Sequence, residues 1–390
     1  MALEPYCRVL HVVDSLGPGG AQTILKVYLE DVVARGANGD SHSLYALRRV
    51  PNELSIAGAD VTIDSSPGRY SLGPLLRLWR LVRARRIRVL HCHLFRAQAL
   101  GYLLKRLVEP RMGLVFHEHG RVIGTEGESA LERLAFRILL QLARSQVDCF
   151  VCISGHVRDK LLEVIPMVAE RAIVVANPIP TRAGCEAQVD AEAPRREVDI
   201  PVGAFVVGFA GRLVGRKGWR DFLVAMKLLS ARIPIFFLVT GDGPDRDAVR
   251  EAIVTLGLGQ RGRMLGHVQQ KDMGSFYRRL DCLAMPSHWE PHGLAHLEAQ
   301  SYGVPVVVSD VPGLNATVHT DEDALLFPAG DAAALAEKIL LIALDGVLRF
   351  RLSSGGKVNA ARFSVDAFAR RLDVIYAALC STPPRSYNVD

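Results

Sequence analysis

This 390-residue sequence shows neither a long apolar run nor the pattern of a secretory leader. Its longest apolar runs, such as 205–210 and 233–240, fall far short of the roughly 18–20 residues that a membrane-spanning helix needs. The N-terminus shows no basic region followed by an apolar stretch, which is the pattern of a secretory signal. These absences predict a cytoplasmic protein with no membrane-spanning helix.

The cysteines follow no regular pattern. There are seven of them, an odd number scattered over a long chain, so a disulfide framework is not expected. Cys149 and Cys152 form a CxxC within the apolar run 148–154, where positions of opposite parity in a strand point to opposite faces. No second CxxC or HxxxH accompanies them, so neither a metal nor a redox role is predicted for this pair.

The overall composition is that of an ordinary globular protein. Hydrophobic residues make up 49% and charged residues 23% of the chain, which argues against disorder. A single hydrophobic core stops growing at about 250–300 residues, so a chain of this length is expected to form two domains. The formal net charge is +6, and residues 1–198 contribute +5 of it.

Strand-like and helix-like segments alternate through both halves of the chain. Strands separated by helices indicate an α/β fold, with a parallel sheet covered by helices on both faces. Residues 180–200 interrupt the alternation and are interpreted as a linker or as a loop near a domain boundary, which gives domains of about 1–180 and 200–364. Strands are expected at 8–13, 89–93, 114–117, 204–210, 236–240, 282–285 and 306–309, and helices at 24–34, at 75–85 and after 365.

Three turns in the second half follow apolar strands, the place where ligands bind in open α/β sheets. The turn 211–218 holds three glycines and three cations, which would allow close backbone approach to a phosphate and neutralise its charge. Taken alone, this turn is equally well explained as a solvated basic turn. The GxGP at 241–244 is, taken alone, equally well explained as a tight turn. The third turn lies within 286–299 and precedes a helix expected to begin near Leu294, whose unpaired N–H groups would suit a diphosphate.

Two glutamates stand eight positions apart around that third turn. In a continuous helix Glu290 and Glu298 would be roughly 12 Å apart, wider than the about 5–9.5 Å between the carboxyl groups of glycosidases. A hydrolase is therefore disfavoured, although the turn would shorten the gap. Glu298, about one turn inside the helix, is placed to accept hydrogen bonds from ribose hydroxyls.

Together these motifs resemble the C-terminal domains of the retaining GT-B glycosyltransferases of glycosyltransferase family 4. Those domains carry a GRL…KG turn, a GxGP turn and a PS…EPxGLxxLEA…GxPVVxS run. The same order and spacing occur here at 211–218, 241–244, 286–299 and 303–309. The resemblance implies a GT-B fold, with two Rossmann-like domains facing a central cleft and the C-terminal segment, about 365–390, packed back on the first domain.

The resemblance also implies roles for individual residues. Arg212 and Lys217 would hold the donor diphosphate, Glu298 the ribose, and Glu290 the transferred sugar as a catalytic residue. Two departures, His292 where the family usually has Phe and 313–315 where a glycine pair and a Glu are common, leave the identity of the sugar open. The donor-binding residues would be Arg212, Lys217, Gly241, Val268, Glu290, Gly293, Leu294 and Glu298.

The first half resembles the acceptor side of these enzymes. Gly19 and Gly20 belong to a loop similar to the family's GGxE/Q loop at the reacting centre, with a plain turn before a helix as the alternative. The family places a histidine at the end of the strand that closes with His117-Glu118-His119-Gly120. The histidine–glycine form selects His119 as the catalytic histidine, and His117 remains the alternative.

No metal and no cofactor are expected beyond the nucleotide-sugar donor. His91 and His93 end another strand, but pairs at period two on two strands offer no evident third ligand for a cluster with His117 and His119. The sequence 321–323 mimics a DxD metal motif. GT-B enzymes, however, meet donor phosphates with cationic side chains and helix ends.

The activity implied by the resemblance is retaining, metal-independent transfer of a hexose-type sugar from a UDP- or GDP-sugar to a hydroxyl acceptor. The acceptor would be a sugar, a lipid-linked or another hydroxyl compound in cell-envelope polysaccharide, glycolipid or other glycoconjugate biosynthesis. The alternatives are a catalytically inactive sugar-nucleotide-binding GT-B protein, and a GT-B epimerase or phosphorylase. Nucleic acid is not expected as a partner.

An arginine-rich amphipathic segment, 75–88, has two interpretations. It is either the solvated face of a helix packed on the sheet, or a contact with anionic lipid. The second interpretation would place the protein at the inner face of the cell membrane as a peripheral protein.

Overall fold

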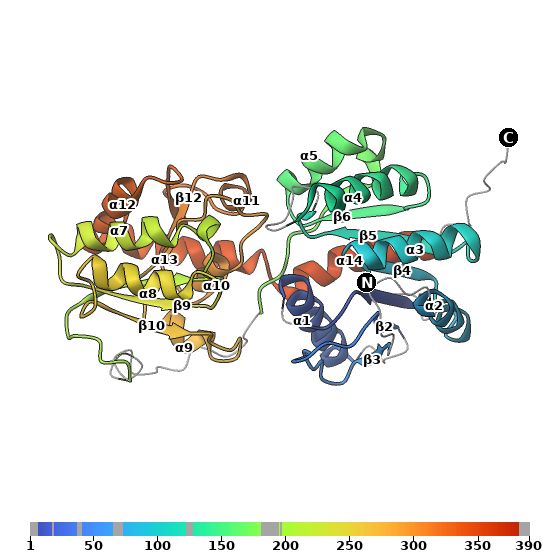
Figure 1. Ribbon diagram of the computed structural model, residues 1–390, viewed down its shortest axis with the longest axis horizontal. Helices are drawn as coiled ribbons and strands as arrows, with labels where there is room; N and C mark the ends of the chain where they lie inside the picture. The colour runs from blue at the N-terminus through green and yellow to red at the C-terminus, as the bar shows by residue number, and fades with distance from the viewer. Residues whose placement is uncertain are drawn as a thin grey trace. The chain divides into compact units, whose positions relative to one another are not determined.

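The computed structural model describes residues 7–17, 19–36, 41–64, 73–121, 128–180, 195 and 197–381. The chain divides into two compact units, Met1–Pro178 with Val365–Asp390, and Ile179–Ser364 (Figure 1). Each unit contains one parallel β-sheet with helices on both faces, which confirms the predicted α/β class. Most of the expected linker, 181–194 and 196, lies outside the described residues.

The first unit is built on a seven-stranded sheet in the order β3-β2-β1-β4-β5-β6-β7. All neighbouring strands run parallel, and the register sets His11 beside His91 and His93 beside His117. The strands are β1 (Val9–Val13), β2 (His42–Ala46), β3 (Asp60–Ile63), β4 (Val89–His93), β5 (Gly113–Glu118), β6 (Cys149–Cys152) and β7 (Ala172–Val174).

Alternation along each strand sends side chains into two separate cores of the first unit. Leu10 and Val12 of β1 enter one core, with residues of α2, α3, α4 and α5. Val9 and Val13 enter the other, with residues of α1 and α14. The helices are α1 (Gly20–Ala34), α2 (Gly73–Ala84), α3 (Phe95–Leu107), α4 (Ala130–Ala143), α5 (Gly155–Val164), the 3₁₀ turn η2 (Pro166–Arg171) and α14 (Val365–Ser381).

The last helix, α14, completes the first unit although the whole second unit precedes it in the chain. Its apolar residues Phe368, Leu372 and Tyr376 are buried in the core shared with α1. Near its end, Cys380 forms a disulfide with Cys7, with the Cα atoms 5.9 Å apart. The cysteine count and spacing gave no sign of this bond, because its two ends are 373 positions apart in sequence.

The second unit is built on a six-stranded parallel sheet in the order β10-β9-β8-β11-β12-β13. Its strands are β8 (Phe205–Ala210), β9 (Ile235–Thr240), β10 (Gly262–Gly266), β11 (Cys282–Met285), β12 (Val306–Ser309) and β13 (Ala324–Phe327). Its helices are η3 (Gly215–Lys217), α7 (Trp219–Leu229), α8 (Arg246–Thr255), α9 (Met273–Arg278), α10 (Ala295–Ser301), α11 (Pro312–Asn315), α12 (Ala332–Leu344) and α13 (Gly346–Ala361).

Every strand expected from the sequence is present, with bounds that agree to within one residue. The agreement is close because buried parallel strands are short apolar runs bounded by glycine, proline and polar residues. None of the described helices is both long and apolar enough to cross a membrane.

Candidate active site

A pocket of about 370 Å³ lies at the carboxyl ends of β8, β9 and β10 in the second unit. In parallel sheets this edge gathers the loops that bind ligands. Five of the predicted donor-binding residues line it: Arg212, Gly241, Val268, Leu294 and Glu298. The remaining lining residues are Ala210, Gly211, Thr240, Asp242, His267, Gln270, Met273, Tyr277 and Ala295.

Glycine is required where the first two turns of the pocket meet. Gly241 has a φ of +130°, and a Cβ placed on it would lie 1.8 Å from the carbonyl oxygen of Gly211. The backbone N–H of Gly241 donates to the carbonyl of Gly266, 2.8 Å away. The turns after β8, β9 and β10 are therefore packed backbone to backbone, which leaves room for a ligand to approach main-chain atoms.

Glu298 lies in the first turn of α10, which begins at Ala295 next to the expected start. Its Oε2 accepts a hydrogen bond from the Tyr277 hydroxyl at 2.7 Å, and its Oε1 accepts one from the Gln270 amide at 3.1 Å. Burial and the nearby Glu298 carboxylate raise the pKa of Tyr277 well above its usual value, so the phenol stays a donor. These bonds fix the orientation of the carboxylate at the pocket wall.

Lys217 and Glu290 form an ion pair that the sequence did not predict. The two side chains are only 15% and 8% exposed. Gly218 brings them together, because its φ is +70° and a Cβ there would lie 1.8 Å from the Pro286 carbonyl oxygen. The sequence placed Lys217 on the diphosphate and Glu290 on the sugar, and the structure joins the two side chains directly.

The turn before α10 is held by close packing around Gly293. Its φ is +73°, and a Cβ there would lie 2.6 Å from Leu314. His292 is buried, donates from Nδ1 to the Gly293 carbonyl at 2.8 Å, and meets the ring of Phe363 edge-on. Burial lowers the pKa of His292, so a neutral aromatic ring occupies the position where the family usually has Phe.

In the first unit, the predicted loop residues precede a helix. Gly19 is the N-cap of α1, and Gly20 is the first residue of that helix. A Cβ on Gly20 would meet nothing within 4 Å, whereas one on Gly19 would collide with the Gln22 side chain at 2.5 Å. Pro18, between these glycines and Gly17, lies outside the described residues.

His119 follows β5 and belongs to a set of histidines beneath α1 and α14. The Nδ1 of His93 contacts the Nε2 of His119 at 3.1 Å, and the rings of His117 and His119 stack with centroids 4.2 Å apart. Burial lowers the pKa of His119 to about 4, so its ring is neutral near pH 7. His117 is fully buried, and neither of its ring nitrogens has a hydrogen-bond partner among the described residues.

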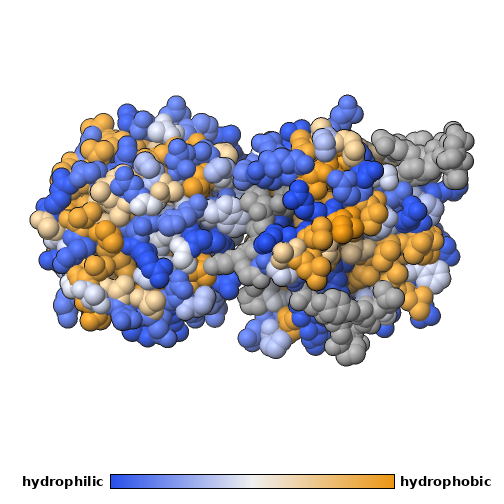
Figure 2. Space-filling view, turned by 45° about the horizontal axis from the view of Figure 1, so that its top comes forward, coloured by the Kyte–Doolittle hydropathy of each residue, from blue (hydrophilic) through white to orange (hydrophobic). Residues whose placement is uncertain are grey.

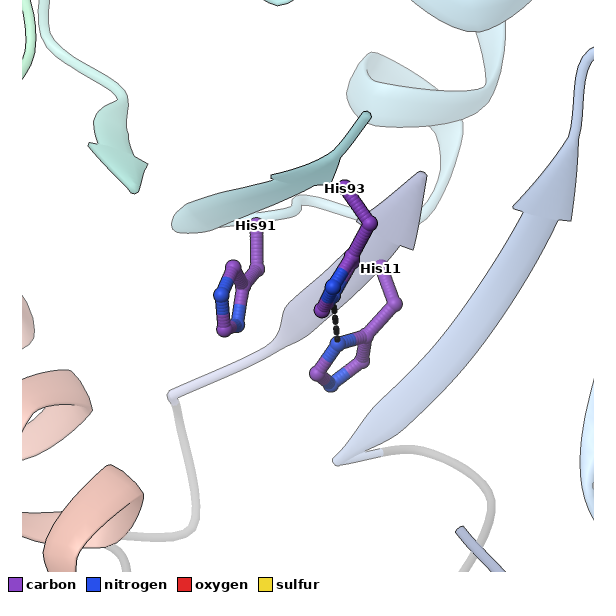
Figure 3. A group of neighbouring side chains, drawn as sticks. All are labelled: His11, His91 and His93. Carbon is purple, nitrogen blue, oxygen red and sulfur yellow. Dashed lines mark hydrogen bonds between the residues drawn. The ribbon is translucent and has the colours of Figure 1, made fainter. Parts of the chain in front are cut away.

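The set includes two further histidines that the sequence analysis did not single out. His11 on β1 and His42 on β2 join His91, His93, His117 and His119, so that six imidazoles gather on one face of the sheet. Figure 3 shows His11, His91 and His93, which come from the adjacent strands β1 and β4. Finding this set from the sequence would have required the order of the strands in the sheet, in which β1 lies between β2 and β4.

The CxxC and the DxD-like sequence, for which no metal role was predicted, have structural roles. Cys149 and Cys152 lie in the two different cores of the first unit, as their strand parity predicted. Asp323 is buried, accepts the backbone N–H of His319 at 2.8 Å and contacts the His319 ring at 2.9 Å. Its carboxylate therefore stabilises the turn before β13.

Two models of known protein families match this chain. The model of the family described as Glycosyl transferases group 1 matches residues 190–358, and that of Glycosyltransferase Family 4 matches residues 31–183. The chain belongs to glycosyltransferase family 4. The first match lies within the second unit and the second match lies mainly in the first unit, so the assignment rests on both.

Two curated relatives illustrate the level of similarity. The 2-deoxystreptamine N-acetyl-D-glucosaminyltransferase of Streptomyces fradiae is 32% identical over 274 residues, which is 67% of this chain and 62% of that protein. The D-inositol 3-phosphate glycosyltransferase of Xylanimonas cellulosilytica is 31% identical over 277 residues, 70% of this chain and 64% of that protein. The alignments thus span less than two thirds of these relatives.

A solved structure supports the fold over nearly the whole chain. Anabaena HepE in complex with UDP has a TM-score of 0.78 and 19% identity, and the match covers 95% of this chain and 100% of HepE. The family 4 chain therefore has the GT-B fold that its motifs implied.

Proposed function

We propose that this chain is a retaining glycosyltransferase that moves a hexose-type sugar from a UDP- or GDP-sugar to a hydroxyl acceptor. The observation that carries the proposal is the pocket in which Arg212, backbone of the glycine turns and Glu298 converge. A guanidinium suits a diphosphate, and a carboxylate held at the wall suits ribose hydroxyls. The acceptor would belong to cell-envelope polysaccharide, glycolipid or other glycoconjugate biosynthesis.

The chemistry of such a transfer follows from where charge develops. Positive charge grows on the sugar ring and negative charge on the leaving diphosphate, so Arg212 and the N–H groups around Leu294 would stabilise the departing phosphate. Lys217, which is paired with Glu290, would also contribute positive charge, and Glu290 would lie on the sugar side. No metal is required at the diphosphate in this scheme, and the leaving phosphate would help deprotonate the acceptor hydroxyl. The roles of His119, Gly19 and Gly20 stay predictions.

The activity is tested by incubating the purified protein with radiolabelled UDP- and GDP-sugars and measuring release of free sugar or transfer to added acceptors. Turnover of at least one donor is expected. Tight nucleotide binding without any turnover would instead identify an inactive sugar-nucleotide-binding protein. Conversion of the donor sugar without its transfer would identify an epimerase.

Arg212→Ala is expected to weaken binding of the preferred nucleoside diphosphate by about 10- to 150-fold. It removes a charge-assisted hydrogen bond, worth about 1.5–3 kcal/mol. Lys217→Ala is expected to weaken binding as well, and it also leaves the Glu290 carboxylate without its cation. Titration calorimetry with UDP and GDP measures both effects. Arg250→Ala, an exposed cation on α8 paired with Asp247, is the matched control, and unchanged affinity in both pocket variants would refute the assignment.

We also propose a peripheral contact with anionic membrane, carried by α4. Its apolar side chains at i, i+3, i+7 and i+11 are each at least 49% exposed, namely Leu131, Leu134, Ile138 and Leu142. Figure 2 shows an apolar area on the surface of the first unit. The arginines of the 75–88 segment are less available, since Arg77, Arg83 and Arg85 pair with Asp64, Glu109 and Asp60.

Replacing Leu134 and Ile138 together with serine is expected to reduce binding to phosphatidylglycerol vesicles at least about tenfold. Burying one Leu or Ile side chain is worth about 1.5–3 kcal/mol, and two are removed. Vesicle flotation measures the bound fraction. Leu344→Ser removes an exposed leucine of α12 and should leave flotation unchanged. Equal flotation of the wild type and the α4 variant would contradict the proposal.

A further inference from the structure

Three buried histidines of the first unit are arranged around a common point. His11 comes from β1, and His91 and His93 come from β4, with all three side chains at most 2% exposed. One ring nitrogen of each lies within 4.8 Å of a ring nitrogen of the other two. Figure 3 shows the rings of His11 and His93 in contact and that of His91 beside them.

The spacing of these nitrogens fits a shared metal ion. The Nδ1 of His11 and the Nε2 of His93 are 3.3 Å apart. Two nitrogens that each bind one tetrahedral ion at about 2.0–2.1 Å are about 3.3–3.4 Å apart, by simple trigonometry. The Nε2 of His91 is buried and has no hydrogen-bond partner among the described residues, so this nitrogen is available as the third ligand.

The other nitrogen of each ring has a partner that would orient it. The Nδ1 of His91 meets the Tyr376 hydroxyl at 2.6 Å, the Nε2 of His11 meets His42 at 3.4 Å, and the Nδ1 of His93 meets His119 at 3.1 Å. Metal-binding histidines almost always have such a partner, which fixes the tautomer and the ring plane. A hydrogen-bonded chain of neutral imidazoles explains the contacts of His11 and His93, but it leaves His91 Nε2 unexplained.

We propose that His11, His91 and His93 bind a late first-row transition-metal ion such as Zn²⁺ in the core of the first unit. Three imidazoles without a carboxylate or thiolate suit zinc, copper or nickel and do not suit Mg²⁺ or Ca²⁺, which prefer oxygen ligands. The site uses no residue of the donor pocket, although its ligand His93 contacts His119, the predicted catalytic histidine.

A second group, His93 with His117 and His119, shares one histidine with this site. The proposal selects the first group because all three of its rings have an orienting partner, whereas His117 has none among the described residues. Variants of His91 and His117 therefore distinguish the two positions, since each belongs to only one group.

The test uses the full-length chain, stripped of metal with a chelator and titrated with Zn²⁺. Calorimetry and elemental analysis are expected to show one tightly bound zinc per chain. Tyr376→Phe removes only the hydroxyl that orients His91, and it should weaken zinc binding about 10- to 100-fold. Tyr102→Phe on α3 is the matched control and should bind zinc as the wild type does. His91→Phe should abolish binding, whereas His117→Phe should retain it.

A spectroscopic measurement on the wild type keeps the test independent of folding of the variants. X-ray absorption of the zinc-loaded chain should show three imidazole nitrogens at about 2.0–2.1 Å. Absence of stoichiometric zinc, or a zinc shell without imidazole scattering, would overturn the proposal. Loss of binding in His117→Phe with retention in His91→Phe would overturn the ligand assignment, because the ion would then lie in the second group.

Discussion

Glu290→Gln should lower turnover by about 10- to 150-fold while leaving the affinity for nucleoside diphosphate within about twofold. Glutamine keeps the size and a hydrogen-bond acceptor but loses the charge that pairs with Lys217. Loss of a charge-assisted contact is worth about 1.5–3 kcal/mol. The loss should appear in kcat because the contact matters most as positive charge develops on the sugar ring.

Glu298→Gln is the matched variant and should show the opposite pattern, with nucleoside diphosphate affinity falling about 10- to 150-fold. The amide can no longer accept from both Tyr277 and Gln270 and also from ribose hydroxyls. Tyr277→Phe, which removes one donor but keeps the carboxylate, should have a smaller effect. If Glu290→Gln loses nucleotide affinity and Glu298→Gln does not, the two roles are inverted. If neither variant changes affinity or turnover, the donor site lies elsewhere.

The ion pair allows a sharper version of the Glu290 experiment. If Lys217 and Glu290 act as a unit, Lys217→Met combined with Glu290→Gln should be little worse than either single variant. Turnover of the two single variants and the double variant measures the coupling. Fully additive losses would show that Lys217 meets the diphosphate independently of Glu290.

The second large effect expected is acid destabilisation of the first unit, measured in the presence of a chelator. Burial lowers the pKa of His91 to about 3 and the pKa values of His42 and His119 to about 4, against 6.5 for an exposed histidine. Below pH 6.5 the unfolded chain takes up protons that the folded chain does not. The contribution of these histidines to the free energy of unfolding is therefore fully present above pH 6.5, and it is lost as the pH falls toward 4.

The expected size of this effect is large. Each of these histidines changes the free energy of unfolding by about 1.4 kcal/mol per pH unit below pH 6.5, so the three together change it by about 4 kcal/mol per pH unit. Whole proteins are stable by only about 5–15 kcal/mol, so the first unit should unfold between about pH 5 and pH 4. Urea unfolding at several pH values measures the slope, and amide hydrogen exchange in β1 and β4 localises it. His42→Gln should reduce the pH dependence of the free energy of unfolding by the amount that corresponds to about one proton. A free energy of unfolding that is flat between pH 7 and pH 5 would contradict this expectation.

The sequence by itself determined the two α/β units, the strand bounds and the donor-site motifs. Buried parallel strands are continuous apolar runs, and glycine turns after them recur with fixed spacing, so both are visible locally. Gly241 and Gly293 are examples, because each sits at a positive φ that disfavours other residues. Arg212 and Glu298 could be assigned to one pocket from these turns alone, because the carboxyl ends of parallel strands meet at one edge.

Some features depend on which strands and helices become neighbours, and only the tertiary structure determined these. The Cys7–Cys380 bond joins the two ends of the first unit, and the Lys217–Glu290 pair joins two turns 73 positions apart. The histidine set follows from the order β2-β1-β4-β5, which brings His11 and His42 beside His91 and His93. The spacing of His91 and His93 along one strand, or of His117 and His119 at the end of another, carries no information about which strands become neighbours. The order of the strands in the sheet is what brings His11 beside His91 and His93 as the third proposed ligand.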